Sequence, residues 1–334
     1  MQKRLSIVLT VGLSIGAICA VRITRAADLS RTTPSSLQRA LTELARQARP
    51  GTLGIEVTDL QSGRTWRVNA ERAFPLMSVF KAPLGATVLS QVDGGALSLG
   101  QPVTIRRSEL MTGGLSPIAA TFRGSEETFT LRQLLQAAVS QSDNTAADVL
   151  LQRVGGPSAV TAFLRAHGIR NMRIDRGEDQ IAQEFQVQAA QRAEESKESP
   201  AQRDARLRRG YEAYLEDPRD RATPDAAVQF LNKLWRRELL SAHSTALLLN
   251  LLYRQTIPAR LRAGLPPGVR LADKCGTSYT VDGMTAAFND IGILTWPDGR
   301  TVIVAAFLTG SHAPETRMNA LFKTLAGDVV DDPR

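Results

Sequence analysis

The spacing of apolar positions predicts helices and strands in an order that brings both ends of the chain into one sheet. Residues 35–49 carry leucines at helical spacing, and Pro50-Gly51 ends that pattern. Apolar and polar residues alternate over residues 52–60, and residues 65–69 pair back on them as a hairpin. Further strands and a last helix are expected at residues 271–277, 286–295, 301–308 and 314–325.

Between these groups of strands the pattern is mainly helical, from residue 78 to about residue 225. We therefore predict an α+β fold, with an antiparallel sheet from both chain ends, flanking helices and an inserted all-helical subdomain. An active site would lie in the cleft between sheet and helices. The sheet subdomain is expected at residues 33–77 and 255–330 and the helical subdomain at residues 78–254. The clearest helices are expected at residues 84–92, 131–140, 145–154 and 158–167.

One segment within the helical part, residues 183–220, is unusually rich in charged and amide side chains. We interpret it as a charged insertion, either a solvated helical excursion or a partly mobile flap, and contact with substrate or a partner stays an alternative. Its sparse apolar residues are Phe185, Val187, Tyr211, Tyr214 and Leu215.

Composition describes an ordinary globular protein, because 43% of the 334 residues are hydrophobic and 22% are charged. The net charge is +8, but the basic residues are spread along the chain, and no zinc-finger or aromatic-basic RNA motif accompanies them. We therefore expect no nucleic-acid partner.

The N-terminus has the pattern of a signal peptide. Lys3 and Arg4 precede an apolar run over residues 5–20, and small residues at Ala20 and Ala26 offer cleavage points within residues 1–26. The run is short for a spanning helix, which needs about 20 apolar residues, although a retained anchor is the alternative. We expect a periplasmic or secreted protein, with no stable membrane insertion once the signal is removed.

Cysteine and histidine usage excludes several kinds of site. Cleavage at either point removes Cys19 and leaves Cys275 as the one cysteine, so no intramolecular disulfide can form. His167, His243 and His312 are the only histidines, and none lies in a recognisable catalytic segment. A Ser-His-Asp triad and a zinc site are therefore disfavoured, and no metal or cofactor is expected.

Ser78 and Lys81 form the first chemistry-bearing pair. Positions three apart share one face of a helix, so the lysine amine can lie beside the serine hydroxyl. A lysine kept from water can accept a proton, whereas an exposed lysine cannot. Taken alone the pair also fits a helix-capping serine with a surface lysine.

Ser142-Asp143-Asn144 lies between two predicted helices. These residue types are common at helix starts, but they also suit chemistry. The Ser142 hydroxyl could relay a proton to a leaving nitrogen, and Asn144 could bind a substrate amide and orient Lys81.

A third group, Lys274-Cys275-Gly276-Thr277, lies on a predicted strand. Lys274 would attract a substrate carboxylate, and Gly276 would let a substrate approach the strand backbone. The Thr277 N–H, together with that of Ser78, could form an oxyanion hole.

Together these groups occur in the order and on the elements that their roles require, and the chain resembles a class A serine β-lactamase from about residue 33 to residue 330. Three longer stretches are similar to that family as well. They are residues 141–147 with 155–157, residues 260–266 and residues 285–292.

The resemblance implies a monomer that hydrolyses β-lactam antibiotics through an acyl-enzyme on Ser78. Residues 174–179 resemble the family's omega loop, which makes Glu178 the expected general base for releasing the acyl group. Either Lys81 or a water bound to Glu178 would take the serine proton during acylation.

Several positions depart from the family pattern. Cys275 replaces a Thr or Ser, and its thiol is a weak hydrogen-bond donor to a substrate carboxylate. Ala182 stands where a polar side chain often holds the hydrolytic water, and Leu115 replaces an aromatic residue at the rim of the cleft. We also find no arginine at the usual place after the strand with Lys274.

Two other functions remain open from the sequence. A D-alanyl-D-alanine peptidase or esterase would use the same Ser78 and Lys81 but does not need Glu178. A non-catalytic binder of penicillin or peptidoglycan is motivated by Cys275 and Ala182.

Overall fold

The computed structural model describes residues 35–111, 114–185 and 199–332. The predicted signal peptide with Cys19 and both cleavage points, as well as Val187 of the charged insertion, lies outside the described residues. No helix in the described part of the chain is long and apolar enough to cross a membrane.

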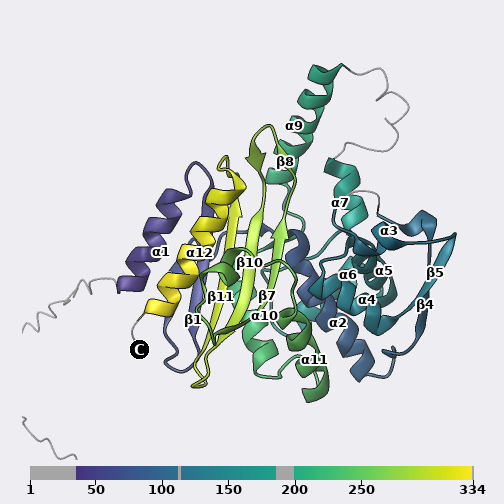
Figure 1. Ribbon diagram of the computed structural model, residues 1–334, viewed down its shortest axis with the longest axis horizontal. Coiled ribbons are helices and arrows are strands. Elements are labelled where there is room, and N and C mark those ends of the chain that lie inside the picture. Colours follow the sequence, from purple (N-terminus) through teal and green to yellow (C-terminus); the bar gives the residue numbers. More distant parts are fainter. Residues whose placement is uncertain (1–34, 112–113, 186–198, 333–334) are drawn as a thin grey trace, which may run out of the picture. The chain divides into compact units, whose positions relative to one another are not determined.

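The central element is a five-stranded antiparallel sheet with strand order β2-β1-β11-β10-β7 (Figure 1). Strands from both chain ends meet at its centre, where Thr52 lies opposite Thr309. The predicted α+β fold is therefore confirmed. The strands are β1 (Thr52–Asp59), β2 (Thr65–Val68), β7 (Arg270–Thr277), β10 (Phe288–Thr295) and β11 (Thr301–Thr309).

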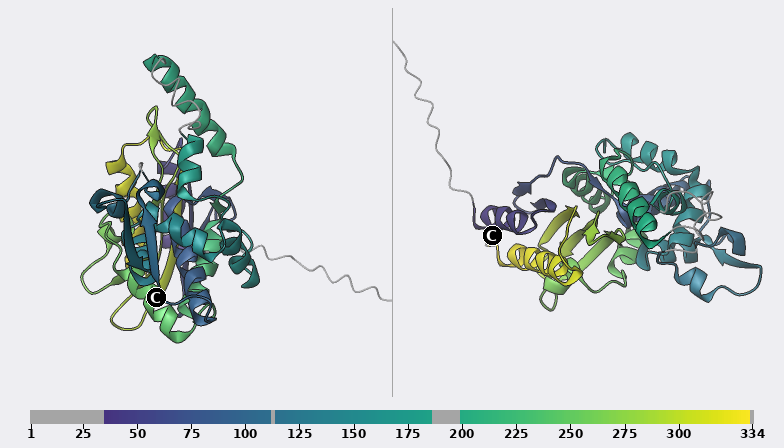
Figure 2. Two further views of the ribbon diagram at one scale, coloured as in Figure 1. Left: turned by 90° about the vertical axis from the view of Figure 1, so that its right-hand side faces the viewer. Right: turned by 90° about the horizontal axis from the view of Figure 1, so that it is seen from above.

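Two helices cover one face of this sheet. These are α1 (Ser36–Gln47) and α12 (Glu315–Asp331), which lie side by side in Figures 1 and 2. The Ser35 hydroxyl caps α1 by accepting a hydrogen bond from the Gln38 N–H. The leucines predicted to form its apolar face are buried against β-strand side chains such as Val304. The last helix continues to Asp331, beyond its predicted end at residue 325.

The other face of the sheet is covered by the helical part of the chain, so β10 and β11 are buried on both faces. Helix α10 packs on β1, β10 and β11, and α11 packs on β7 and α2. The helices of this part are α2 (Lys81–Asp93), α3 (Pro117–Thr121), α4 (Leu131–Ser140), α5 (Asn144–Val154), α6 (Pro157–Ala166), α10 (Pro224–Trp235) and α11 (Ala242–Tyr253), with short 3₁₀ helices η1 (Met77–Phe80), η2 (Arg107–Glu109) and η4 (Arg260–Gly264).

The prediction of an all-helical insertion is wrong in one respect, because short strands occur within it. β4 (Pro102–Arg106) pairs with β5 (Glu126–Thr130), and β6 (Arg221–Ala222) pairs with β3 (Phe74–Pro75). Burial on β4 follows the alternation of a strand, with Val103 and Ile105 inside. Five residues are too short a run for that alternation to stand out within a helical stretch.

Helix α7 (Glu178–Phe185) leads into the charged insertion, and α9 (Pro200–Glu216) lies within it. They pack against each other, and α9 also contacts the hairpin β8 (Thr280–Val281) and β9 (Met284–Thr285) at the end of the main sheet (Figure 1). The insertion therefore packs against this hairpin and is more than a solvated excursion.

Candidate active site

Ser78 lies in η1, immediately after β3 and before α2 begins at Lys81. The Asn289 amide of β10 holds this turn by donating to the Pro75 and Leu76 carbonyls, at 2.7 and 3.2 Å. Met77 adopts a φ of +46°, a conformation that is costly for a long side chain. Such strain concentrates at functional sites, where the surrounding structure imposes it.

Lys81 contacts Ser78 as the spacing predicted, with 2.9 Å between its Nζ and the Ser78 Oγ. The ammonium is fully buried, and it also reaches the Ser142 carbonyl at 2.9 Å and the Asn144 Oδ1 at 2.5 Å. The Glu178 Oε1 lies 2.9 Å from the same nitrogen. Four oxygens thus surround a group with three N–H donors, so every N–H of the Lys81 ammonium has an acceptor.

Ser142 and Asn144 come from the loop between α4 and α5. Ser142 has a φ of +58°, which turns the loop so that its carbonyl faces Lys81. The buried Asp143 carboxylate accepts from the Ala146 N–H at 2.8 Å, which caps α5, and from the Ile118 N–H at 2.7 Å. The contact with Ile118 also holds the neighbouring loop that contains Leu115. The Leu115 carbonyl in turn accepts a hydrogen bond from the Asn144 N–H.

Glu178 begins α7 and is nearly inaccessible to solvent. Its Oε1 accepts a hydrogen bond from the Ser78 hydroxyl at 3.2 Å. Asp148 of α5 holds the loop in place, because its carboxylate accepts from the Glu178 and Asp179 N–H groups at 2.7 and 2.8 Å. Burial raises the pKa of Asp148 to about 6.

Sequence reasoning did not identify Asp148, although a local signal for it exists. It stands four residues after Asn144 on the same helix, so both side chains leave α5 on one face. A second anchor of the loop is the ion pair between Arg176 and Asp220, with 2.6 Å between Nε and Oδ2. Asp220 also accepts the Asp175 and Arg176 N–H groups, at 2.7 and 3.1 Å.

Lys274 lies on β7 on the opposite side of the site. Its Nζ donates to the Ser142 Oγ at 2.9 Å and to the Cys275 carbonyl at 3.0 Å. Complete burial lowers its pKa to about 8, because the charged form loses its hydration, and the positive charge of Lys81 acts in the same direction.

The backbone of β7 passes directly beside the serine. A Cβ added to Gly276 would lie 2.6 Å from the Leu76 carbonyl oxygen and 3.1 Å from the Ser78 nitrogen. No side chain fits in that space, so a glycine is required there. The next residue, Thr277, continues this edge of the pocket.

Cys275 is turned away from the serine, with its Sγ accepting from the Gln255 amide at 3.1 Å. No arginine stands at the usual place after β7, but Arg260 of η4, which precedes this strand in the sequence, reaches it. Its guanidinium is buried over the Phe288 ring and donates to the Gly276 carbonyl at 3.2 Å and to the Thr277 hydroxyl. Sequence alone did not identify it, since it precedes β7 and reaches the site only through the fold.

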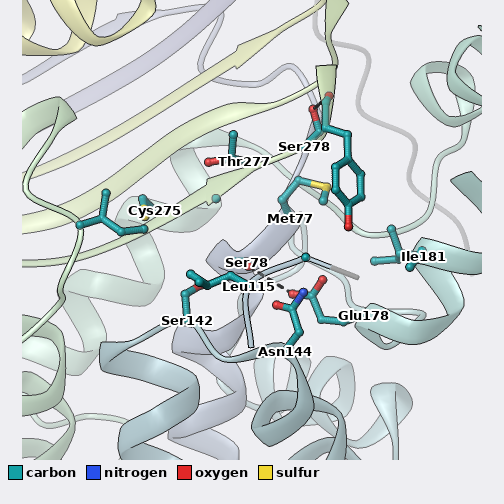
Figure 3. Close-up of a pocket in the computed structure, with 15 residues that line it drawn as sticks. Met77, Ser78, Leu115, Ser142, Asn144, Glu178, Ile181, Cys275, Thr277 and Ser278 are labelled. Carbon is teal, nitrogen blue, oxygen red and sulfur yellow. Dashed lines mark hydrogen bonds between the residues drawn. The ribbon is translucent and has the colours of Figure 1, made fainter. Parts of the chain in front are cut away.

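These residues surround one pocket of about 230 Å³. Figure 3 shows Thr277 and Ser278 on the strand side and Ser142, Asn144 and Glu178 on the helical side, with Ser78 between them. Leu115, half exposed, forms part of the rim, and Ala182 and Ile181 place apolar side chains beside Glu178. The structure thus brings every predicted site residue to one place, although Lys81 and Lys274 lie beneath the pocket surface.

Comparison with known proteins finds the same architecture and considerable sequence similarity. The model of the beta-lactamase enzyme family matches residues 36–332. The extended-spectrum β-lactamase PER-1 of Pseudomonas aeruginosa is 34% identical over 269 residues, which cover 80% of this chain and 78% of that protein. The β-lactamase VEB-1 of the same species is 29% identical over 79% of this chain and 80% of its own length.

Two solved structures have the same fold. A β-lactamase from Chitinophaga pinensis superposes with a TM-score of 0.75 at 31% identity, covering 88% of this chain and 99% of that one. An ancestral class A β-lactamase of Gram-negative bacteria gives a TM-score of 0.72 at 33% identity, with the same coverage of both chains. The chain therefore belongs to the class A β-lactamase family.

Proposed function

We propose that the protein hydrolyses β-lactams by nucleophilic attack of Ser78 on the lactam carbonyl, through a covalent acyl-serine. The observation that carries this proposal is the position of the Ser78 hydroxyl, 2.9 Å from the Lys81 amine and 3.2 Å from the Glu178 carboxylate. A serine is a weak nucleophile unless a neighbouring base accepts its proton, and both neighbours are at hydrogen-bond distance.

Either neighbour can act in acylation. Glu178 is a direct acceptor for the Ser78 proton, and a neutral Lys81 would be an equally close one. As the carbonyl carbon becomes tetrahedral, its oxygen would be stabilised by the N–H groups of Ser78 and Thr277. The close approach of Gly276 to the Ser78 nitrogen supports this arrangement.

The leaving nitrogen would take a proton from Ser142. Lys274 supports that transfer, because its ammonium donates to the Ser142 Oγ and so stabilises the oxygen as it loses a proton. The charges of Lys274 and Arg260 also make this end of the pocket favourable for the carboxylate of the substrate. Asn144 would bind the substrate amide at the other side of the serine.

Glu178 would then drive deacylation. Once Ser78 carries an acyl group, its Oγ no longer donates a proton, and the Glu178 carboxylate is free to accept one from water. Asp148 holds the Glu178 backbone through two N–H contacts and so fixes the carboxylate near the ester. Ala182 offers no polar atom for that water, which makes Glu178 the principal group to orient it.

We further propose that the protein works as a monomer in the periplasm or outside the cell. The basic start followed by the apolar run at residues 5–20 supports export.

A chromogenic cephalosporin mixed with the purified protein tests the proposal. We expect many turnovers per molecule, together with a transient mass increase that maps to Ser78. A stoichiometric adduct that persists would instead indicate a penicillin-sensitive peptidase. Neither hydrolysis nor adduct would indicate a binding protein and refute the proposal.

The charge of Lys274 predicts a pH dependence. Burial lowers its pKa to about 8, so the ammonium loses its proton as the pH rises through 8, well before an ordinary lysine would. Substrates with a carboxylate should then bind less well, and KM should rise at alkaline pH. Measuring KM from about pH 6 to about pH 9.5 brackets that pKa and checks the prediction. Lys274→Arg, which stays charged, should lack the alkaline rise, and an identical rise in both proteins would assign it to another group.

A further inference from the structure

The charged insertion reaches the active site through two tyrosines. Tyr211 and Tyr214 stand three residues apart on α9, so they leave the helix on one face, and both are buried. They form a small apolar cluster with Met77, Ala286 and Ala287. This cluster lies directly behind Ser78 and beside the residues that lead into β10.

The Tyr211 hydroxyl joins the end of β7 to the start of β10. It accepts from the Ala286 N–H, donates to the Tyr279 carbonyl at 2.5 Å and lies 2.9 Å from the Ser278 Oγ. The Ala287 N–H donates to the same Ser278 oxygen at 3.0 Å. One phenol on an inserted helix therefore fixes the backbone that follows Thr277.

Tyr279 extends from this fixed backbone across the pocket. A Cβ added to Gly114, on the helical side, would lie 3.2 Å from the Tyr279 hydroxyl and 2.7 Å from the Asn144 amide nitrogen. Tyr279 is 44% exposed and lines the pocket, so part of its surface is accessible to a ligand. Tyr279 and Glu178 line the same pocket, and partial burial, together with the negative charge of Glu178, raises the pKa of the Tyr279 hydroxyl.

The pocket thus has two chemically different ends. Lys274 and Arg260 supply positive charge at one end, while Tyr279, Ile181 and Gly114 form the other. In penicillins and cephalosporins the carboxylate and the acylamino substituent leave the fused rings on opposite sides. A substrate whose carboxylate lies at the cationic end must direct its acyl side chain toward Tyr279.

We propose that Tyr279 is a specificity-determining residue that restricts the bulk of the substrate's acyl side chain, and that Tyr211 of α9 is the positioning residue that holds it across the pocket. The inference rests on the proposed β-lactam hydrolysis. It assigns the insertion a role in substrate selection.

The kinetic test compares two cephalosporins with the same nucleus, one with a compact arylacetyl side chain and one with a branched oxyimino side chain. Tyr279→Ala should raise the ratio of kcat/KM for the bulky over the compact substrate by roughly tenfold. Tyr211→Phe should raise the same ratio, because it removes the hydroxyl and keeps the ring. Tyr214→Phe is the matched control on the same helix, since its hydroxyl contacts the Met77 sulfur, and it should leave the ratio unchanged.

The double variant shows whether the two residues act together. Adding Tyr211→Phe to Tyr279→Ala should change the ratio no further, because Tyr211 acts on selection only through Tyr279. Fully additive effects would show that Tyr211 does not position Tyr279. An unchanged ratio in Tyr279→Ala would overturn the specificity assignment.

A second readout does not depend on activity. Removing the Tyr211 hydroxyl should speed amide hydrogen exchange at Ala286 by roughly tenfold, while β11 keeps its protection. Unchanged exchange at Ala286, or equal acceleration in β11, would refute the positioning role. If the wild-type protein hydrolysed neither cephalosporin, the proposed function would fail, and the exchange measurement would still decide whether Tyr211 holds this turn.

Discussion

Replacing Ser78 by alanine should abolish both hydrolysis and the covalent adduct, with kcat falling by roughly 10⁴-fold or more. The substitution removes the only serine oxygen that contacts both Lys81 and Glu178 among the described residues. It leaves the Ser78 N–H and the strand with Gly276 in place, so substrate should still bind. Turnover of a chromogenic cephalosporin and intact mass measure the two effects.

Ser116→Ala is a suitable control, because it removes a serine hydroxyl from the residue that follows Leu115 of the rim. That hydroxyl contacts Asp143 and Thr145, and Ser78 keeps its partners. The control protein should still form the adduct. An adduct on the Ser78→Ala protein would identify a different nucleophile and refute the assignment of Ser78.

Sequence reasoning identified the parts of the site that depend on short-range geometry. Ser78 and Lys81 share a helical face, and Ser142 and Asn144 belong to one loop, so spacing along the chain predicted their proximity. Lys274 was assigned because its strand follows the groups of Ser78 and Ser142 in the order typical of the family it resembles. Gly276, two residues later, suggested the close approach of a ligand or another backbone. The contact of Gly276 with the turn around Ser78 has this form.

The parts that escaped prediction depend on contacts between distant segments. Asp148 holds Glu178 across 30 residues, and Arg260 reaches Thr277 across 17 residues and from a different element. Arg260 leaves no periodic trace in the sequence, and the only trace of Asp148 is its position four residues after Asn144. Tyr211 and Tyr214 do have a helical spacing, but the charged residues around them favoured the prediction of a solvated surface.

The strands were predicted with similar limits. β1, β10 and β11 are long enough for their apolar residues to stand out, and one antiparallel sheet from both chain ends was predicted, although without its strand order. β4 and β5 are five residues each, and β6 is two, so their alternation is lost within helical surroundings. Short strands are defined by their partners more than by their own sequence.

Glu178→Gln should separate the two halves of the reaction. The amide keeps the size of the carboxylate and can still contact Ser78, but it cannot accept a proton from water. Deacylation should slow by roughly 10²–10⁴-fold, the usual contribution of a general base. Acylation should persist if Lys81, which is 2.9 Å from the Ser78 Oγ, takes the serine proton.

The expected result is a burst of one product per protein molecule, followed by an acyl-enzyme that persists in the intact mass. Asp179→Asn is the matched control, since Asp179 is an exposed neighbour whose carboxylate contacts Gln183, away from Ser78, and this variant should keep cycling. If the Glu178→Gln protein instead stayed unacylated, Glu178 would be the base for acylation, and Lys81 would serve to hold the charges of the site. The intact mass of the Glu178→Gln protein differs between the two outcomes. That one measurement therefore decides whether Lys81 or Glu178 takes the serine proton, which the distances alone do not.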